Sequence, residues 1–290
     1  MSEGNYLVWR STLLKLNMSC SKVAIGVPLS RRRNYLEISH VSRRAKRGSK
    51  SVLKAIIVDV DGTLYSQPPV RRYVASRLFL HALRRPAGAW RTARALSAYR
   101  HAQESLRGSS SPIAANLQLS WAAEKTGYGE DFVSGCVTEW MDRIPLPALA
   151  AARYSGIVTF LAWATERGLR IAALSDYNPH EKIRALGLAD FFSVVVHSQE
   201  PEVGVFKPNP KGLRIAQQRL DAQPHEVVYI GDRPEVDGAV ALTGGVAGFI
   251  LSPKLVQCPP GVEWASDWMQ IRRFVEARMA NISGGTMYET

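Results

Sequence analysis

The sequence has few cysteines and no long apolar run, and each absence excludes a class of protein. Its three cysteines, Cys20, Cys136 and Cys258, are widely spaced and form no metal-ligand pattern, so we expect no disulfide framework. Free thiols are typical of a reducing compartment, which predicts a cytoplasmic protein. No apolar stretch approaches the ~20 residues that a membrane-spanning helix requires, and no internal repeat is present. At 46% hydrophobic and 21% charged residues, the 290-residue chain has the composition of an ordinary globular protein with a sizeable core.

Acidic residues are scarce in the first 50 residues. This segment contains eleven Lys or Arg against Glu3 and Glu37, a net charge of +9 out of the chain's +12, which leaves +3 for the other 240 residues. It is rich in serine and has weak periodicity, so we predict a poorly ordered basic extension over residues 1–50. Other interpretations stay open: an upstream stretch before a true start nearer Met18 or later, a transit peptide for an organelle, or a basic arm for nucleic acid or anionic lipid. Because the excess does not belong to the body of the chain, nucleic acid is not expected as a partner beyond weak contacts of this arm.

One stretch, from Lys54 to Tyr65, combines a buried strand with two acids. The apolar run 55–58 is rich in β-branched residues and has the length of a strand buried on both faces. Asp59 and Asp61 follow its carboxyl end, where open α/β sheets bind their ligands. At a spacing of two residues we expect both carboxylates to point the same way, which concentrates charge that a cation or a proton must relieve. Taken alone, a strand that ends in an Asp-Gly turn explains the pair equally well.

The remaining pattern alternates between strands and helices, apart from one helical stretch. Strands are predicted at 55–58, 170–174, 193–197, 227–230 and 246–251. Only helices are predicted between 70 and 154, after a break at Pro68-Pro69. Their separators are Gly88, the stretches 108–112 and 127–129, and the Pro145/Pro147 pair.

Alternating strands and helices imply a parallel sheet with right-handed crossovers. We therefore predict an α/β fold, a Rossmann-like doubly wound parallel sheet with an all-helical cap domain. The predicted core is discontinuous and comprises residues 51–66 and 155–280. The cap is expected at 67–154 and a tail at 281–290.

Polar side chains follow the ends of four predicted strands. In chain order they are Asp59 with Asp61, Ser175, Lys207, and Asp232 with Asp237. In a doubly wound sheet these edges converge on one crevice. Acid pairs, a hydroxyl and an ammonium suit the handling of a phosphoryl group with a hard cation, and Mg²⁺ prefers carboxylate oxygens and water. One carboxylate can then attack phosphorus, while another protonates the leaving oxygen and later activates water.

Together, these motifs resemble the four motifs of the haloacid dehalogenase (HAD) superfamily. The residues are Asp59-Val60-Asp61-Gly62-Thr63-Leu64, Ser175, Lys207 and Gly231-Asp232-x4-Asp237, in that order, and the resemblance covers about residues 54–251. The helical insertion resembles that family's α-helical cap. Members that act on carbon–halogen bonds lack the second Asp of the first motif, so Asp61 favours phosphate-ester chemistry.

The resemblance implies a role for each residue. Asp59 would be the nucleophile and Asp61 the general acid/base, and Mg²⁺ would be bound by Asp59, the main-chain carbonyl of Asp61, Asp232 and Asp237, the last as a ligand or as support. Phosphate would be bound by Ser175, Lys207, Gly62, Thr63 and Asp176. Asp176 stands where many relatives carry Asn, and its acid could shape the leaving-group side or face away.

These implications predict a Mg²⁺-dependent phosphohydrolase that cleaves a small phosphorylated metabolite through an aspartyl-phosphate. A phosphotransferase such as a phosphomutase would share every motif, and a non-catalytic binding protein on this fold is the third alternative. Each residue taken alone also has a structural explanation: a capping hydroxyl for Ser175, a solvated loop for Lys207, and turn residues for Asp232 and Asp237. The first half of the cap is basic, which indicates either a solvated face or a lid that attracts an anionic substrate. Its arginines are Arg71, Arg72, Arg84, Arg85, Arg91, Arg94 and Arg100.

Overall fold

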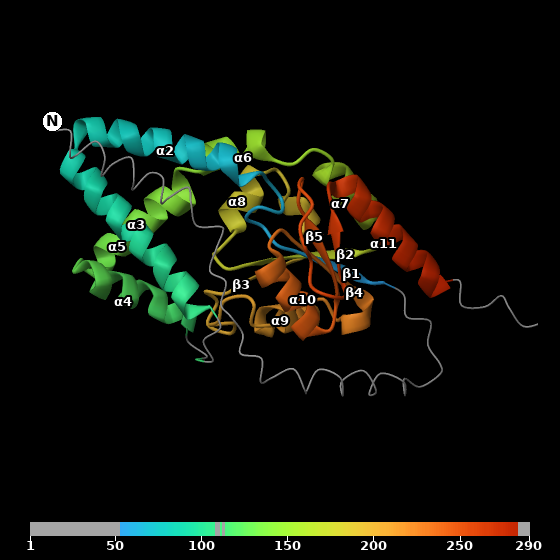
Figure 1. Cartoon of the computed structure of the whole chain (residues 1–290). Helices are drawn as coiled ribbons and strands as arrows, with labels where there is room; N and C mark the ends of the chain where they lie inside the picture. The colour runs from blue at the N-terminus through green and yellow to red at the C-terminus, as the bar shows by residue number, and fades with distance from the viewer. Residues whose placement is uncertain (1–52, 108–110, 112–113, 284–290) are drawn as a thin grey trace, which may run out of the picture. The chain divides into compact units, whose positions relative to one another are not determined.

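The computed structural model describes residues 53–107, 111 and 114–283 (Figure 1). The expected basic extension, residues 1–50, lies outside the described residues. The expected tail lies outside them from residue 284 onward, because the last helix continues to Ser283. No described helix has the length and apolar character needed to cross a membrane.

The centre of the fold is a six-stranded parallel sheet. In chain order its strands are β1 (Ala55–Val58), β2 (Arg170–Ser175), β3 (Val194–His197), β4 (Val227–Gly231), β5 (Ala247–Leu251) and β6 (Val262–Ala265). In space they run β3-β2-β1-β4-β5-β6, all parallel. This confirms the predicted doubly wound parallel sheet. The sequence pattern did not predict β6, because only its two end residues are buried.

Helices cover both faces of the sheet, as the alternation along β1 requires. Ile56 and Val58 pack in one apolar cluster with side chains from α7 (Ile157–Glu166), α8 (His180–Ala185) and α11 (Trp268–Ser283). Ala55 and Ile57 pack in another with α9 (Lys211–Arg219) and α10 (Ala239–Gly244). All four residues of β1 are fully buried, so the strand that precedes the acids lies at the centre of the core.

A helical insertion separates β1 from α7. It contains α2 (Gln67–Arg84), α3 (Pro86–Leu106), α4 (Ala114–Thr126), α5 (Glu130–Val137), the π-helical turn η3 (Thr138–Arg143) and α6 (Leu146–Ala152) (Figure 1). Four separators were predicted wrongly. Pro68 and Pro69 lie in the first turn of α2 and Pro147 in that of α6, where a missing N–H costs no hydrogen bond. Gly88 lies inside α3, and the break falls at Arg85 instead.

The two chain segments that join insertion and core run side by side. Tyr65 and Arg153 form an antiparallel bridge. On either side of it, the Ser66 N–H donates to the Ala152 carbonyl at 2.9 Å and the Tyr154 N–H to the Leu64 carbonyl at 3.2 Å. The insertion therefore leaves and re-enters the core at one place.

The strand order reverses between β1 and β4. The chain moves outward from β1 to β2 and β3 on one side, and then crosses to β4, β5 and β6 on the other. In open α/β sheets a crevice forms at the carboxyl edge of such a switch point. The residues after β1 and β4 are therefore placed to form a site.

Candidate active site

Asp59 is the first residue after β1 and has a partner on each carboxylate oxygen. Its backbone N–H continues the sheet by donating to the carbonyl of Ile230 at 2.8 Å. Its Oδ1 accepts a hydrogen bond from Lys207 Nζ at 2.5 Å, and its Oδ2 accepts one from the Thr63 hydroxyl at 2.9 Å. Asp59 is buried, and these hydrogen bonds hold its carboxylate in one orientation.

The turn after Asp59 depends on a glycine. Gly62 has a φ of +106°, and a Cβ there would lie 2.2 Å from Asp232 Oδ2. Only a residue without a side chain allows this backbone and this close approach to the end of β4. Gly62 thus brings the first motif against Asp232.

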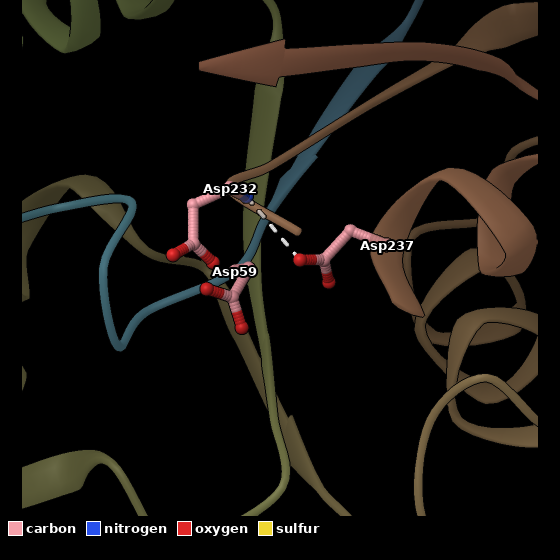
Figure 2. A group of neighbouring side chains, drawn as sticks. All are labelled: Asp59, Asp232 and Asp237. Atoms are coloured by element: carbon pink, nitrogen blue, oxygen red, sulfur yellow. Dashed lines mark hydrogen bonds between the residues drawn. The ribbon is translucent and has the colours of Figure 1, made fainter. Parts of the chain in front are cut away.

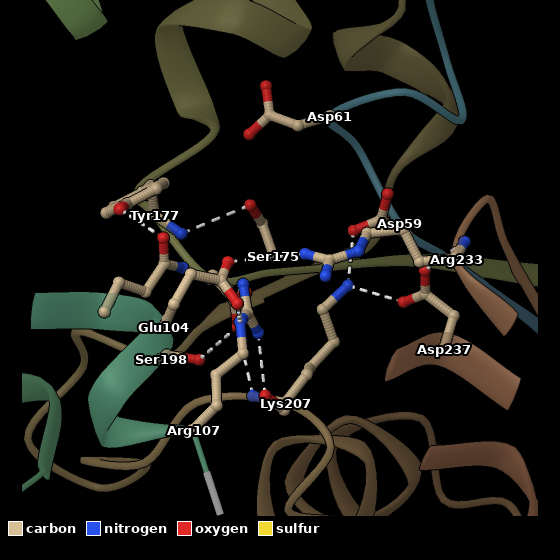
Figure 3. A network of polar contacts seen from close by, with 12 residues as sticks. Asp59, Asp61, Glu104, Arg107, Ser175, Tyr177, Ser198, Lys207, Arg233 and Asp237 are labelled. Atoms are coloured by element: carbon tan, nitrogen blue, oxygen red, sulfur yellow. Dashed lines mark hydrogen bonds and ion pairs between the residues drawn. The ribbon is translucent and has the colours of Figure 1, made fainter. Parts of the chain in front are cut away.

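Lys207 lies between two carboxylates. Its Nζ donates to Asp59 Oδ1 and, at 2.7 Å, to Asp237 Oδ1 (Figure 3). Burial lowers the pKa of this lysine, but Asp237 and Asp59 outweigh that effect and raise the pKa well above its ordinary value. Lys207 is therefore a permanent cation, and the solvated loop position considered for it is wrong because its side chain is buried.

Three carboxylates meet beside this lysine. Asp59, Asp232 and Asp237 each offer an oxygen, and the three oxygens lie within 4.8 Å of one another (Figure 2). Burial and the charge of Asp237 raise the pKa of Asp59 to about 7, against the opposing charge of Lys207. Burial and the charge of Asp59 likewise raise the pKa of Asp232 well above its usual range. One lysine therefore does not neutralise the group.

Asp237 differs from the other two because its acceptor positions are occupied. Its Oδ1 accepts hydrogen bonds from Lys207 and from the Tyr229 hydroxyl at 2.8 Å. Its Oδ2 accepts from the backbone N–H groups of Asp232 at 3.2 Å and Arg233 at 3.0 Å. Burial opposes its charge, but Lys207 and these hydrogen bonds lower the pKa of Asp237 below its usual value. Asp237 shapes the loop after β4, while Asp59 and Asp232 carry the surplus negative charge.

This donor set fits a hard divalent cation. Hard cations bind carboxylate and carbonyl oxygens, and a divalent charge would relieve the repulsion that raises the pKa of Asp59 and Asp232. The residues of the site are therefore suited to Mg²⁺.

The carboxylate of Asp61 has hydrogen-bond partners that differ from those of Asp59, although its charge still contributes to raising the pKa of Asp59. Both residues lie beyond the last strand residue, Val58, where the two-residue alternation of a strand no longer holds. Lys182 Nζ donates to both carboxylate oxygens of Asp61, at 2.8 and 2.9 Å, and the Tyr65 hydroxyl donates to one of them. The Asp61 carbonyl accepts from Gln67 Nε2 at 2.7 Å.

The charge around Asp61 favours its ionised form. Burial would raise the pKa of Asp61, but the charge and hydrogen bonds of Lys182 and the hydroxyl of Tyr65 outweigh it and lower the pKa. The insertion contributes Asp142, whose own pKa is raised by burial and by Asp61 against the effect of Lys182. Lys182 is buried on α8, and the sequence did not reveal it because a lysine at the third position of a helix matches no motif.

Asp176 joins the insertion to the core. Its Oδ1 accepts from the Ser198 hydroxyl and from the backbone N–H of Lys207, both at 3.1 Å. Its Oδ2 accepts from Gln103 Nε2 at 3.1 Å and pairs with Arg107 Nη2 at 2.7 Å. Arg107 also donates to the Lys207 carbonyl at 2.7 Å (Figure 3). Both carboxylate oxygens of Asp176 are therefore occupied by groups of the protein itself, and its binding of phosphate stays a prediction.

The other predicted phosphate-binding residues lie around Asp59. Ser175 ends β2, is buried, and accepts a hydrogen bond on Oγ from the Tyr177 N–H at 3.3 Å. Its hydroxyl proton therefore stays available to an acceptor.

A further ion pair joins the insertion to the core. Glu104 on α3 pairs with Arg233, in the loop after β4, at 3.5 Å. It also pairs with Arg107, directly after α3, at 3.1 Å.

Fold and site together define an α/β enzyme with a buried carboxylate at the switch point of a parallel sheet. The family model of the haloacid dehalogenase-like hydrolases matches residues 53–245. The chain therefore belongs to that family, as its motifs predicted.

Two curated proteins illustrate the relationship. A glyceraldehyde 3-phosphate phosphatase of Methanopyrus kandleri is 31% identical over 193 residues, which are 64% of this chain and 78% of that protein. A phosphoserine phosphatase of Thermus thermophilus is 38% identical over 96 residues, which are 32% of this chain and 38% of that protein. Among solved structures, a 2-haloacid dehalogenase from Pseudomonas syringae matches 78% of this chain and 99% of its own, with a TM-score of 0.56 and 20% identity. That likeness concerns the fold alone.

Proposed function

We propose that the protein is a Mg²⁺-dependent phosphatase that hydrolyses a small phosphate monoester through an aspartyl-phosphate on Asp59. The observation that carries the proposal is the setting of Asp59, which is oriented by Thr63 and Lys207 and lies beside the uncompensated Asp232. A carboxylate so placed is a nucleophile once its charge is balanced.

The contacts of each residue suggest its role in the reaction. Lys207 would steady the negative charge of the transferring group, and the Ser175 hydroxyl would donate to a phosphoryl oxygen. A Mg²⁺ bound by Asp59, Asp232 and the Asp61 carbonyl would neutralise the acids and polarise the phosphoryl oxygens. Asp237 would keep Lys207 and the loop after β4 in place.

In the first step, a carboxylate oxygen of Asp59 attacks phosphorus while the bond to the leaving oxygen breaks. Asp61 gives its proton to that oxygen, so that an alcohol departs. The negative charge of an entering phosphate raises the proton affinity of Asp61, which supplies the acid form for this step.

In the second step, the ionised form of Asp61 takes a proton from water. The water oxygen attacks phosphorus, inorganic phosphate leaves, and the carboxylate of Asp59 is restored. Lys182 supports this step, because its two hydrogen bonds stabilise Asp61 as a base. The same base would also serve an alcohol acceptor, so the product, free phosphate or a phosphorylated acceptor, separates hydrolysis from transfer.

The two curated relatives narrow the substrate class. Their names give glyceraldehyde 3-phosphate and phosphoserine as substrates, and both compounds carry the phosphate on the terminal carbon of a three-carbon skeleton. We therefore propose a short-chain phosphate ester of a primary alcohol as the substrate class of this chain.

The test is phosphate release from a panel of such esters, with Mg²⁺ and with EDTA, and with larger sugar phosphates as the contrast. We expect metal-dependent turnover that Asp59→Asn abolishes, whereas Asp190→Asn, at an exposed site, leaves it unchanged. In ¹⁸O-labelled water the released phosphate should carry the label. A folded wild-type protein without turnover on any ester would refute the proposal, and a phosphorylated acceptor in place of free phosphate would indicate a transferase.

A further inference from the structure

The hairpin of α2 and α3 carries an unbalanced charge. From Gln67 to Gln103 it contains eight arginines and no lysine or acid, a net charge of +8, so the other residues from 51 onward sum to −5. All eight arginines are exposed. They are Arg71, Arg72, Arg77, Arg84, Arg85, Arg91, Arg94 and Arg100. Apart from Arg71, none lies within ion-pair distance of a carboxylate in the part of the chain that the structure describes.

The outer face of α2 adds large apolar side chains to this charge. Phe79, Leu80 and Leu83 are exposed by 58%, 47% and 67%. Phe79 and Leu83 follow Arg72 and Ser76 at helical spacing, so the three apolar residues form one stripe opposite the buried Val70 and Leu78. Adjoining large apolar groups on a charged surface mark an interaction site.

The stripe is too far from the catalytic acids to bind substrate. The first residue of α2, Gln67, contacts the site through the Asp61 carbonyl. At a rise of about 1.5 Å per residue, Phe79 to Leu83 lie roughly 18–24 Å along α2 from that residue. A lid that attracts an anionic substrate therefore does not account for the stripe.

Charge decides between the possible occupants. A second copy of the chain would bring the same arginine-rich surface against itself, because a symmetric contact pairs a surface with itself. The segment 1–50 carries +9 and is repelled likewise. Nucleic acid matches the charge, but it covers leucines chiefly where its bases are unstacked to take apolar wedges, whereas a bilayer covers them without such a cost. An anionic bilayer matches both, since its headgroups attract arginine and its acyl chains accept Phe and Leu.

We propose that the outer face of α2, with Phe79, Leu80 and Leu83 between exposed arginines, docks on the surface of an anionic lipid membrane. The apolar stripe enters the boundary between headgroups and acyl chains, while the arginines contact lipid phosphates. The proposal is independent of the chemistry at Asp59, because it depends on another part of the fold.

The test is co-sedimentation of the full chain with vesicles of phosphatidylcholine alone and of phosphatidylcholine mixed with phosphatidylglycerol. We expect binding to the mixed vesicles only, weakened by salt. Phe79→Ser with Leu83→Ser should weaken it at least about tenfold. Arg72→Gln with Arg84→Gln should weaken it about 25-fold, since each basic group near the surface contributes about fivefold. The matched control is Leu255→Ser with Met269→Ser, which removes exposed apolar groups outside the hairpin and should bind like the wild type.

Three outcomes would overturn the proposal. The first is the absence of vesicle binding by the folded wild type. The second is vesicle binding by the hairpin variants as tight as that of the wild type, which would assign the binding to residues 1–50. The third is a different occupant, seen either as a dimer in light scattering that Phe79→Ser with Leu83→Ser makes monomeric, or as tighter binding to an oligonucleotide than to vesicles. Circular dichroism of each variant separates these outcomes from unfolding.

Discussion

A buried lysine on α8 contacts both oxygens of Asp61 and so controls the charge of the proposed acid/base. We predict that Lys182→Met lowers kcat roughly 10- to 100-fold, with a smaller change in KM, because it removes a positioning group and leaves in place the acid/base itself, which contributes about 10²–10⁴-fold. Without this cation the carboxylate of Asp61 holds its proton to a higher pH, so the acid limb of the rate profile moves to higher pH. Lys182→Arg should restore part of the rate.

Lys125 on α4 is exposed and provides the control, because Lys125→Met should leave rate and profile unchanged. A normal kcat in folded Lys182→Met would contradict the assigned role. The sequence indicated that Asp59, Ser175, Lys207 and Asp232 lie together, because each stands at a strand end or in the loop beyond one, and the topology brings these ends to one edge of the sheet. It could not place Asp176 or Lys182, whose partners come from α3 and from the turn after β1.

Two segments distant in sequence, the end of α3 and the loop after β2, are joined by the largely buried pair of Arg107, directly after α3, and Asp176. We predict that Asp176→Ala lowers the free energy of unfolding by about 3–5 kcal/mol, because the guanidinium of Arg107 loses its main charge partner in a buried place. Glu139→Ala, which breaks the exposed pair with Arg143 in the same insertion, should cost less than about 1 kcal/mol. Urea denaturation of both variants measures the difference, and equal effects would show that the pair adds no stability.

Most elements were predictable because their apolar pattern is strong, and the failures have local causes. The helix α6 was missed because Pro145 and Pro147 suggested a loop, although proline suits a first helical turn. The helix α3 begins before Gly88, since packing of α3 on its neighbours outweighs the modest cost of one glycine. The strand β6 has four residues, of which only the two end residues are buried, and gives too short a signal.

The whole molecule should respond to Mg²⁺ in a pH-dependent way. Folding raises the pKa of Asp59 from 3.8 to about 7, so its ionisation disfavours the folded state progressively as pH rises between these values. Bound Mg²⁺ removes that cost and competes with the proton. We predict that Mg²⁺ raises Tm more at pH 8 than at pH 5.5. We also predict that Asp59→Asn raises Tm in EDTA at pH 8, and that it reduces the increase in Tm caused by Mg²⁺. Thermal scans measure both, and an equal Mg²⁺ effect at the two pH values would contradict the assignment.

The paired crossing at Tyr65 and Arg153 has a further consequence for the molecule as a whole. Because the chain departs and returns at adjacent positions, a short turn could replace everything between them without stretching the sheet. The insertion is in this sense an exchangeable cassette, and another helical module could be spliced in at the same two points. A lineage that retained the catalytic sheet could therefore acquire new substrates, or new surfaces on which to act, by exchanging this single part.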